Sequence, residues 1–247
     1  MNVTGIKTDK ITADSVSLRD ILEKYISSFE ENSVLAVTSK IISICEGRIV
    51  KTGTIDKHEL IEKESDFFIP PSESKYDVTL TIKRNLLIPS AGIDESNGNG
   101  YFILWPSDPQ TTANRVREYI CKRFGLEKIG VIITDSRTSP LRWGTTGTSL
   151  AHSGFSALNN YIGKPDIFGR LLEMTKANVA DSLAESAVLV MGEGREQTPL
   201  AVISDIPFVQ FQSRNPTDEE IKNLNIEIND DVYAPILTSV KWKKKRL

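Results

Sequence analysis

The sequence has few of the residues that build disulfide frameworks and zinc sites. Its 247 residues include two cysteines, Cys45 and Cys121, and two histidines, His58 and His152. Two cysteines do not make the disulfide framework of a small secreted domain, and they favour a reducing compartment. The histidines lack the spacing of a His/Cys zinc site. We therefore expect a cytoplasmic protein without a zinc site of this kind.

The sequence also lacks a long apolar run and a strong net charge. No apolar run approaches the roughly 18 residues of a membrane span. The N-terminus does not show the charged and then apolar pattern of a signal peptide. The formal net charge of -3 argues against a general nucleic-acid-binding surface. With 39% hydrophobic and 26% charged residues, the composition is that of an ordinary globular protein that binds neither membrane nor nucleic acid.

The length allows one large domain or two intimate lobes with a proper core. The sequence contains no internal repeat and no low-complexity linker. We therefore expect a single domain over residues 1–240. The basic segment 241–247 follows it, and we expect this tail to be mobile and solvated.

The apolar patterns predict a mixed α/β fold, because strand-like and helical stretches alternate along the chain. The expected strands lie within 1–12 and at 33–37, 77–82, 101–105, 129–134 and 200–203. The expected helices begin at Asp14 or Ser17, after Lys40, and at 111, 170 and 218. Residues 137–149 are rich in Thr, Ser, Gly and Arg and predict a loop.

Two apolar runs end in an aspartate. One runs from Ile129 to Asp135 and continues to Ser136, and the other runs from Asn85 to Asp94. A carboxylate at the end of a buried strand needs a partner, and ligands sit at the carboxyl ends of strands in open α/β sheets. Hard cations such as Mg2+ and Mn2+ take carboxylate and hydroxyl oxygens. We hypothesise that Asp94, Asp135 and Ser136 hold a divalent metal; the alternative is that each aspartate caps a following turn or helix.

Several short segments could contact a phosphate or another anion. Thr38-Ser39-Lys40 offers hydroxyls and an ammonium after a strand, but it lacks the glycines of a P-loop. Asn97, followed by Gly98 and Gly100, could contact a nucleotide or simply turn the chain. The segment Gly192-Glu193-Gly194 permits close backbone approach to a ligand, or it ends a helix.

Three arginines are candidate anion clamps, because guanidinium groups bind phosphate and carboxylate in a bidentate way. They are Arg137, Arg142 and Arg170. Each could equally be a solvated surface residue.

Six motifs follow one another in a recognisable order. They are Ser39 through Arg48, Ala91-Gly-Ile-Asp94-Glu-Ser-Asn97, Gly130-Val-Ile-Ile-Thr-Asp135-Ser136, Arg142-x-Gly144-x-x-Gly147, Phe168-Gly-Arg170 and Met191-Gly-Glu-Gly194. In order and approximate spacing they resemble the coenzyme F-420-0:L-glutamate ligase (γ-glutamyl ligase) family, over nearly the whole chain.

The resemblance implies a GTP-dependent amide ligase with a mixed α/β fold and an intertwined homodimer. The nucleotide, GTP or ATP, phosphorylates an acceptor carboxylate, and L-glutamate attacks the acyl phosphate. A divalent Mg2+ or Mn2+ bridges the phosphates. The implied metal ligands are Asp94, Asp135 and Ser136, and with Arg142 the two aspartates are the candidate catalytic residues. The nucleotide contacts would come from Ser39, Lys40, Asn97, Gly192, Glu193, Gly194 and Gln197.

Three departures from the family pattern accompany the resemblance. Ile44 stands where the family usually has a lysine, and Lys40 lies one helical turn earlier. The loop after Asp135 lacks the usual glycine and arginine, and the segment from Gly5 to Asp9 matches loosely. We infer that the phosphoryl chemistry is retained and that the acceptor differs, with a folate as the candidate beside F-420-0.

Two other functions fit the same residues. A metal-dependent nucleotide phosphohydrolase would use water in place of the glutamate amine. A nucleotide-binding relative without catalysis is allowed by the missing lysine.

Overall fold

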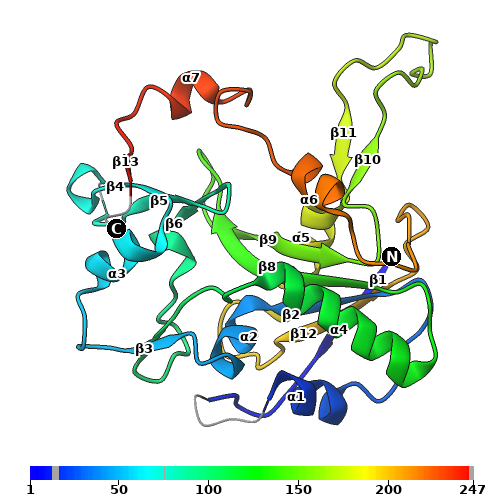
Figure 1. Cartoon of the computed structure of the whole chain (residues 1–247), viewed down its shortest axis with the longest axis horizontal. Helices are drawn as coiled ribbons and strands as arrows, with labels where there is room; N and C mark the ends of the chain where they lie inside the picture. The colour runs from blue at the N-terminus through cyan, green and yellow to red at the C-terminus, as the bar shows by residue number, and fades with distance from the viewer. Residues whose placement is uncertain (13–16, 75, 245–247) are drawn as a thin grey trace.

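The computed structural model describes residues 1–12, 17–74 and 76–244, and it has the mixed α/β fold that the sequence predicted (Figure 1). Its main sheet has five strands in the order β1-β12-β2-β8-β9. The strands are β1 (Asn2–Ile6), β12 (Leu200–Ser204), β2 (Val34–Thr38), β8 (Gly130–Thr138) and β9 (Thr145–Ser153). β2 and β8 pair in parallel, and the other neighbours pair antiparallel.

Helices cover both faces of the main sheet, which explains why β2 and β8 are apolar without alternation. α1 (Leu18–Tyr25), α2 (Ser39–Cys45) and α4 (Pro109–Phe124) pack on one face, where Leu35 and Val131 point. α5 (Val179–Met191) packs on the other face. Figure 1 shows the sheet between α4 and α5.

A smaller sheet lies beside the main one and has the order β13-β4-β5-β6. Its strands are β13 (Lys243–Lys244), β4 (Phe67–Ile69), β5 (Leu80–Lys83) and β6 (Leu86–Pro89). α3 (Lys57–Glu64) and the ribbon of β3 (Ile49–Lys51) with β7 (Tyr101–Ile103) share a separate apolar cluster next to it. The main sheet therefore has an apolar cluster on each face, and α3 with the β3–β7 ribbon has a third.

A long hairpin projects from the body of the protein (Figure 1). It is made of β10 (Leu158–Asn160) and β11 (Lys176–Asn178), with residues 161–175 between them. The sequence predicted a helix over 170–190, but the first part of that stretch forms this hairpin, which in the following text we call the arm. Asn178 caps α5 by accepting a hydrogen bond from the Asp181 N–H, so the helix begins at Val179.

The predicted loop at 137–149 is largely a β-hairpin. β8 continues through Arg137 to Thr138, and β9 begins at Thr145. The stretch has few large apolar residues and two glycines, Gly144 and Gly147, so its composition concealed the pairing. Other expected elements are found: Ser17 caps α1, whereas Asp14, the other candidate cap, lies outside the described residues. α6 (Asp218–Leu224) and α7 (Ala234–Leu237) form the C-terminal region.

The first residues of the predicted mobile tail contact the rest of the protein. Lys243 and Lys244 pair with Phe68 and Phe67, and the Trp242 indole donates to the Leu237 carbonyl oxygen at 2.7 Å. The last three residues, 245–247, lie outside the described part of the chain. Among the described helices, none is both long and apolar enough to cross a lipid bilayer.

His152 makes folding depend on pH. Its side chain is buried on β9 and meets Phe155 edge to face, with the ring centroids 5.4 Å apart. Burial lowers the pKa of His152 to about 4, and Glu220 offsets this only in part. Because the folded state disfavours the protonated ring, stability is complete above the unfolded pKa of about 6.5 and falls as the pH drops towards 4.

We predict that His152→Gln removes this pH dependence, because an amide stays neutral. The free energy of unfolding of the native protein should fall by roughly 3 kcal/mol more than that of the variant between pH 7 and pH 4. Urea titrations at several pH values measure both curves. Parallel curves for the two proteins would contradict the assignment.

Candidate functional site

The parallel pairing of β2 and β8 brings two predicted segments to one edge of the main sheet. Thr38, at the end of β2, is level with Thr134 of β8. Lys40 follows two residues after Thr38, and Asp135 follows directly after Thr134. The two segments are therefore neighbours although they lie far apart in the sequence.

A cavity of about 650 Å³ opens at this edge. Its lining comes from the segment after β1, the start of α2, the turn after β6, the middle of β8 and the loop between α5 and β12. The lining includes Thr8, Lys10, Thr38, Lys40, Ile44, Asp94, Asn97, Asp135, Ser136, Gly192, Glu193, Gly194, Glu196, Gln197 and Thr198. Most of the predicted site residues therefore share one cavity.

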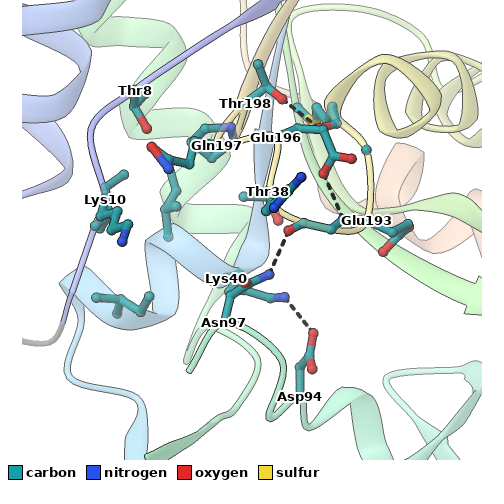
Figure 2. Close-up of a pocket in the computed structure, with 18 of the residues that line it drawn as sticks. Thr8, Lys10, Thr38, Lys40, Asp94, Asn97, Glu193, Glu196, Gln197 and Thr198 are labelled. Atoms are coloured by element: carbon teal, nitrogen blue, oxygen red, sulfur yellow. Dashed lines mark hydrogen bonds and ion pairs between the residues drawn. The ribbon is translucent and has the colours of Figure 1, made fainter. Parts of the chain in front are cut away.

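Lys40 and Asp94 form an ion pair at the mouth of the cavity, with Nζ 2.6 Å from Oδ2 (Figure 2). Ser96 donates to both carboxylate oxygens of Asp94, through its N–H at 2.7 Å and its hydroxyl at 3.0 Å. Burial raises the pKa of Asp94, but Lys40 and Ser96 lower it by more, so the pKa lies below its ordinary value. Asp94 is therefore an anion at neutral pH. The alternative role of a turn cap is also fulfilled, since Asp94 accepts the Ser96 N–H.

Asp135 has a different environment. Its Oδ1 accepts the Ser136 N–H at 2.9 Å, and its Oδ2 accepts the indole N–H of Trp105. Surrounding protein displaces water from the carboxyl, and this burial raises the pKa of Asp135 to about 6, against the opposing effects of Ser136, Trp105 and Lys40. Asp135 lies within β8, so it does not cap a helix. It is a desolvated acid whose hydrogen-bond donors are neutral.

The loop after α5 forms the opposite wall of the cavity. Figure 2 shows Glu193, Glu196 and Gln197 facing Lys40 and Asn97 across the space. The Asn97 side chain donates from Nδ2 to the Gly194 carbonyl oxygen at 2.9 Å, which ties the turn after Asp94 to this loop. Backbone contacts extend the wall, since the Thr8 N–H donates to the Gln197 carbonyl oxygen at 2.8 Å.

Two carboxylates of this loop, those of Glu193 and Glu196, accept hydrogen bonds from groups that could also bind a ligand. Glu193 accepts the Ser136 hydroxyl at 3.3 Å, so a third acid stands beside the predicted ligand pair. Glu196 accepts the Gly194 N–H at 2.8 Å. Gly192 has φ +77, and a Cβ at this position would lie 2.5 Å from the carboxyl carbon of Glu196. The glycine therefore leaves room for that carboxylate. The glycine loop therefore accommodates an anion next to its backbone.

The structure does not bring every predicted residue to the cavity. Ser39 is buried in the first turn of α2 and lies outside the lining, and Arg142 is exposed in the turn between β8 and β9. Arg137 lies 3.7 Å from Asp181, and Arg170 is exposed on the arm, where its N–H donates to Asp166. The arginines were suggested by residue type and, for Arg142 and Arg170, by the family motifs, and neither signal says where a side chain points.

Some lining residues were not predicted. Thr8 belongs to the segment that matched the family loosely, Lys10 follows that segment, and Thr198 lies two residues before β12. Thr38 also lines the cavity, and it belongs to the Thr38-Ser39-Lys40 segment that the sequence suggested as an anion contact. Trp105 had a weaker signal, because a buried indole N–H usually finds a hydrogen-bond acceptor.

The donor set suits a hard cation better than a zinc ion. Two carboxylates and a hydroxyl, from Asp94, Asp135 and Ser136, share the cavity, and oxygen ligands are those that Mg2+ and Mn2+ prefer. Within residues 1–12, 17–74 and 76–244, no three His, Cys, Asp or Glu side chains converge closely enough to hold a metal. Desolvation of Asp135 beside neutral donors would be relieved by a cation. The ligand chemistry therefore fits, while metal binding itself stays a prediction.

We predict that Asn97→Ala loosens the wall formed by residues 192–197. One hydrogen bond contributes about 1 kcal/mol, so amide exchange in this loop should speed up roughly fivefold. Hydrogen–deuterium exchange with mass spectrometry measures it. Asn99→Ala is the matched control, because Asn99 lines the same cavity and the change leaves the Asn97–Gly194 bond in place. Equal exchange in both variants would contradict the prediction.

Comparison with known proteins gives consistent matches. A family model described as F420-0:Gamma-glutamyl ligase matches residues 5–205, a span that contains all the residues lining the cavity. A Methanococcus maripaludis protein named Coenzyme F420:L-glutamate ligase is 31% identical over 223 residues, covering 84% of this chain and 89% of its own length. An Archaeoglobus fulgidus protein of the same name is 36% identical over 202 residues, covering 74% and 81%. A Haloarcula marismortui protein of that name is 42% identical over 120 residues, covering 48% and 46%.

Proposed function

The chain belongs to the F420-0:gamma-glutamyl ligase family, and on that premise we propose that it adds L-glutamate through a γ-linkage to an acceptor carboxylate, using GTP or ATP. The observation that carries the proposal is the shared cavity. Asp94, Asp135, Lys40 and Asn97 line it together with the glycine loop at 192–194. Such a set of carboxylates and an ammonium suits a nucleoside triphosphate bound together with a divalent cation.

The proposed reaction has two steps. An oxygen of the acceptor carboxylate attacks the terminal phosphorus of the nucleotide, the bond from that phosphorus to the bridging oxygen breaks, and the nucleoside diphosphate leaves. The amine of glutamate then attacks the acyl carbon, loses a proton and displaces phosphate. Phosphoryl transfer depends mainly on positioning and charge neutralisation, so no protein nucleophile is needed.

Within this scheme the side chains have separate roles. Lys40 neutralises phosphate charge, and Asn97 contacts the nucleotide from the turn that it ties to Gly194. Asp94, Asp135 and Ser136 would hold Mg2+ or Mn2+, which when bound neutralises charge on the phosphates. Arg142, which the sequence suggested as catalytic, lies outside the cavity and has no role here.

Lys40 is proposed to replace the family lysine that Ile44 displaces. Both residues lie on α2, one turn apart, and both line the cavity. The ion pair of Lys40 with Asp94 keeps the ammonium at the mouth of the cavity. A phosphate entering there would meet the positive charge directly.

The acceptor is proposed to be F-420-0 or a folate. The relatives are named for coenzyme F420, which favours F-420-0. The altered loop after Asp135 suggested a different acceptor, but it forms the β8–β9 hairpin with Arg142 outside the cavity. This supports F-420-0 over a folate.

We predict that Asp94→Asn and Asp135→Asn each reduce glutamyl transfer about 100-fold or more, because each removes a carboxylate proposed to hold the divalent cation that neutralises the phosphates. Mass spectrometry of F-420-0 and reduced folates, incubated with GTP or ATP, Mg2+ or Mn2+ and L-glutamate, measures the gain of one glutamyl residue. Asp230→Asn, an exposed change outside the cavity, should match the native protein.

The same assay separates the competing functions. Nucleotide consumption without any glutamylated product would contradict the ligase and indicate a phosphohydrolase. Nucleotide binding without consumption would indicate a relative that lacks catalysis. Full activity of the two aspartate variants would contradict their proposed roles.

We also propose that the protein is a homodimer and that the arm contributes to its interface. Large apolar side chains are exposed there, with Ile167 at 91%, Phe168 at 90% and Met174 at 84% of full exposure. Apolar side chains gathered on a projecting hairpin favour a protein partner over solvent. The arm extends away from the main sheet, as Figure 1 shows, so it can reach a second copy.

Replacing both Ile167 and Phe168 with Ser should shift the protein from dimer to monomer, because the interface loses its apolar contacts. Sedimentation velocity over a range of concentrations measures the association constant. Val232→Ser, which changes an exposed apolar residue outside the arm, is the control and should leave the dimer unchanged. A dimer that survives the double substitution would contradict the placement.

A further inference from the structure

Trp105 joins the two parts of the protein at the cavity. It follows β7, and its indole donates to Oδ2 of Asp135 on β8 of the main sheet. The side chain is 1% exposed and is among the largest fully buried ones. A buried indole packs as an apolar group, but its single N–H also directs it towards one acceptor. Here that acceptor is the carboxylate that we propose as a cation ligand.

A partly buried ionic cluster contacts Trp105 as well. Arg48 donates from Nε to the Trp105 carbonyl oxygen at 3.1 Å, and the Lys83 ammonium lies 5.2 Å from the centre of the indole ring. Glu64 links the two cations, at 2.7 Å from Arg48 and 2.9 Å from Lys83. Lys83 is nearly inaccessible to solvent. The cluster therefore holds both the backbone and the ring face of Trp105.

Gly92 leaves the space that the indole occupies. A Cβ at this position would lie 2.1 Å from Nε1 of Trp105, and the backbone has φ +68. Any other residue would be strained there and would push the indole off Asp135. Gly92 lies two residues before Asp94, so the turn that carries one proposed ligand also makes room for the group that contacts the other.

The hydrogen bonds around Asp135 fix the plane of its carboxylate. Ser136 holds Oδ1 and Trp105 holds Oδ2, and both oxygens keep further lone pairs for a ligand. Outer partners of this kind orient a ligating carboxylate, and their loss commonly weakens metal binding 10–100-fold. A ring that merely filled space would not need its N–H at this place.

We propose that Trp105 is a positioning residue, which orients the Asp135 carboxylate towards the cavity and thereby sets the affinity for a divalent cation. The inference rests on the proposed function, because that function makes Asp135 a cation ligand. Trp105 itself touches neither the cation nor the substrates. Its effect is carried by the single bond from Nε1 to Oδ2.

The test compares two Trp→Phe substitutions with Mn2+ alone as the probe. Trp105→Phe keeps an aromatic ring but removes the N–H, whereas Trp143→Phe changes a tryptophan that is 94% exposed. Electron paramagnetic resonance of free Mn2+ gives the dissociation constant. We expect it to rise about tenfold or more for Trp105→Phe and less than about twofold for Trp143→Phe. Affinity within twofold of the native protein for Trp105→Phe would overturn the proposal.

A second measurement keeps the inference apart from the proposed function and needs no folded Trp105 variant. The indole N–H of Trp105 gives its own resonance in an ¹H–¹⁵N spectrum of the native protein. Because a bond to a carboxylate is charge-assisted, Asp135→Asn should shift this resonance and leave that of Trp143 in place. An unchanged Trp105 resonance would overturn the positioning role. Failure of the native protein to bind Mn2+ would instead overturn the cation site of the proposed function.

Discussion

The parallel pairing of β2 with β8 is the constraint on which the site depends. It places the end of one buried strand level with the middle of the other, so Lys40 and Asp135 become neighbours at one sheet edge. Antiparallel pairing of β12 with β2 brings in the loop at 192–197 from the other side. The segment after β6 then supplies Asp94. Each segment alone is an ordinary strand end or turn. Strand pairing brings these segments together around one cavity.

The two aspartates of the cavity differ in how their negative charge is compensated, and this difference indicates what the cavity can bind. Asp94 has a cation at 2.6 Å and hydrogen bonds from Ser96, and it stays ionised. Asp135 has neutral donors and a pKa raised to about 6 by burial. A cation bound between them would stabilise the second carboxylate far more than the first. The chain belongs to the F420-0:gamma-glutamyl ligase family, and we propose that this arrangement serves to neutralise phosphate charge.

Local sequence signals predicted most of the main sheet and much of the cavity. Apolar runs revealed β2, β8 and β12, and the strand-end argument selected Asp135, because both features are local. The arm and the β8–β9 hairpin were missed, since polar and small residues pair there through backbone bonds that composition does not reveal. Arg142 lies outside the cavity, and Trp105 was overlooked, because the direction of a side chain and its long-range contacts depend on tertiary packing. The strand-end argument and the family motifs both placed Asp94 with Asp135, and the two residues line the same cavity.

The most direct measurement is a crystal structure with Mn2+ and a non-hydrolysable GTP analogue, using the anomalous signal of manganese to locate the ion. The account predicts a peak within about 2.2 Å of a carboxylate oxygen of Asp94 and of Asp135, with the nucleotide phosphates along residues 192–197. A cation of this kind would need Lys40 to move from Asp94 towards the phosphates. A manganese peak outside the cavity, or a nucleotide bound elsewhere with both aspartates unliganded, would contradict the account.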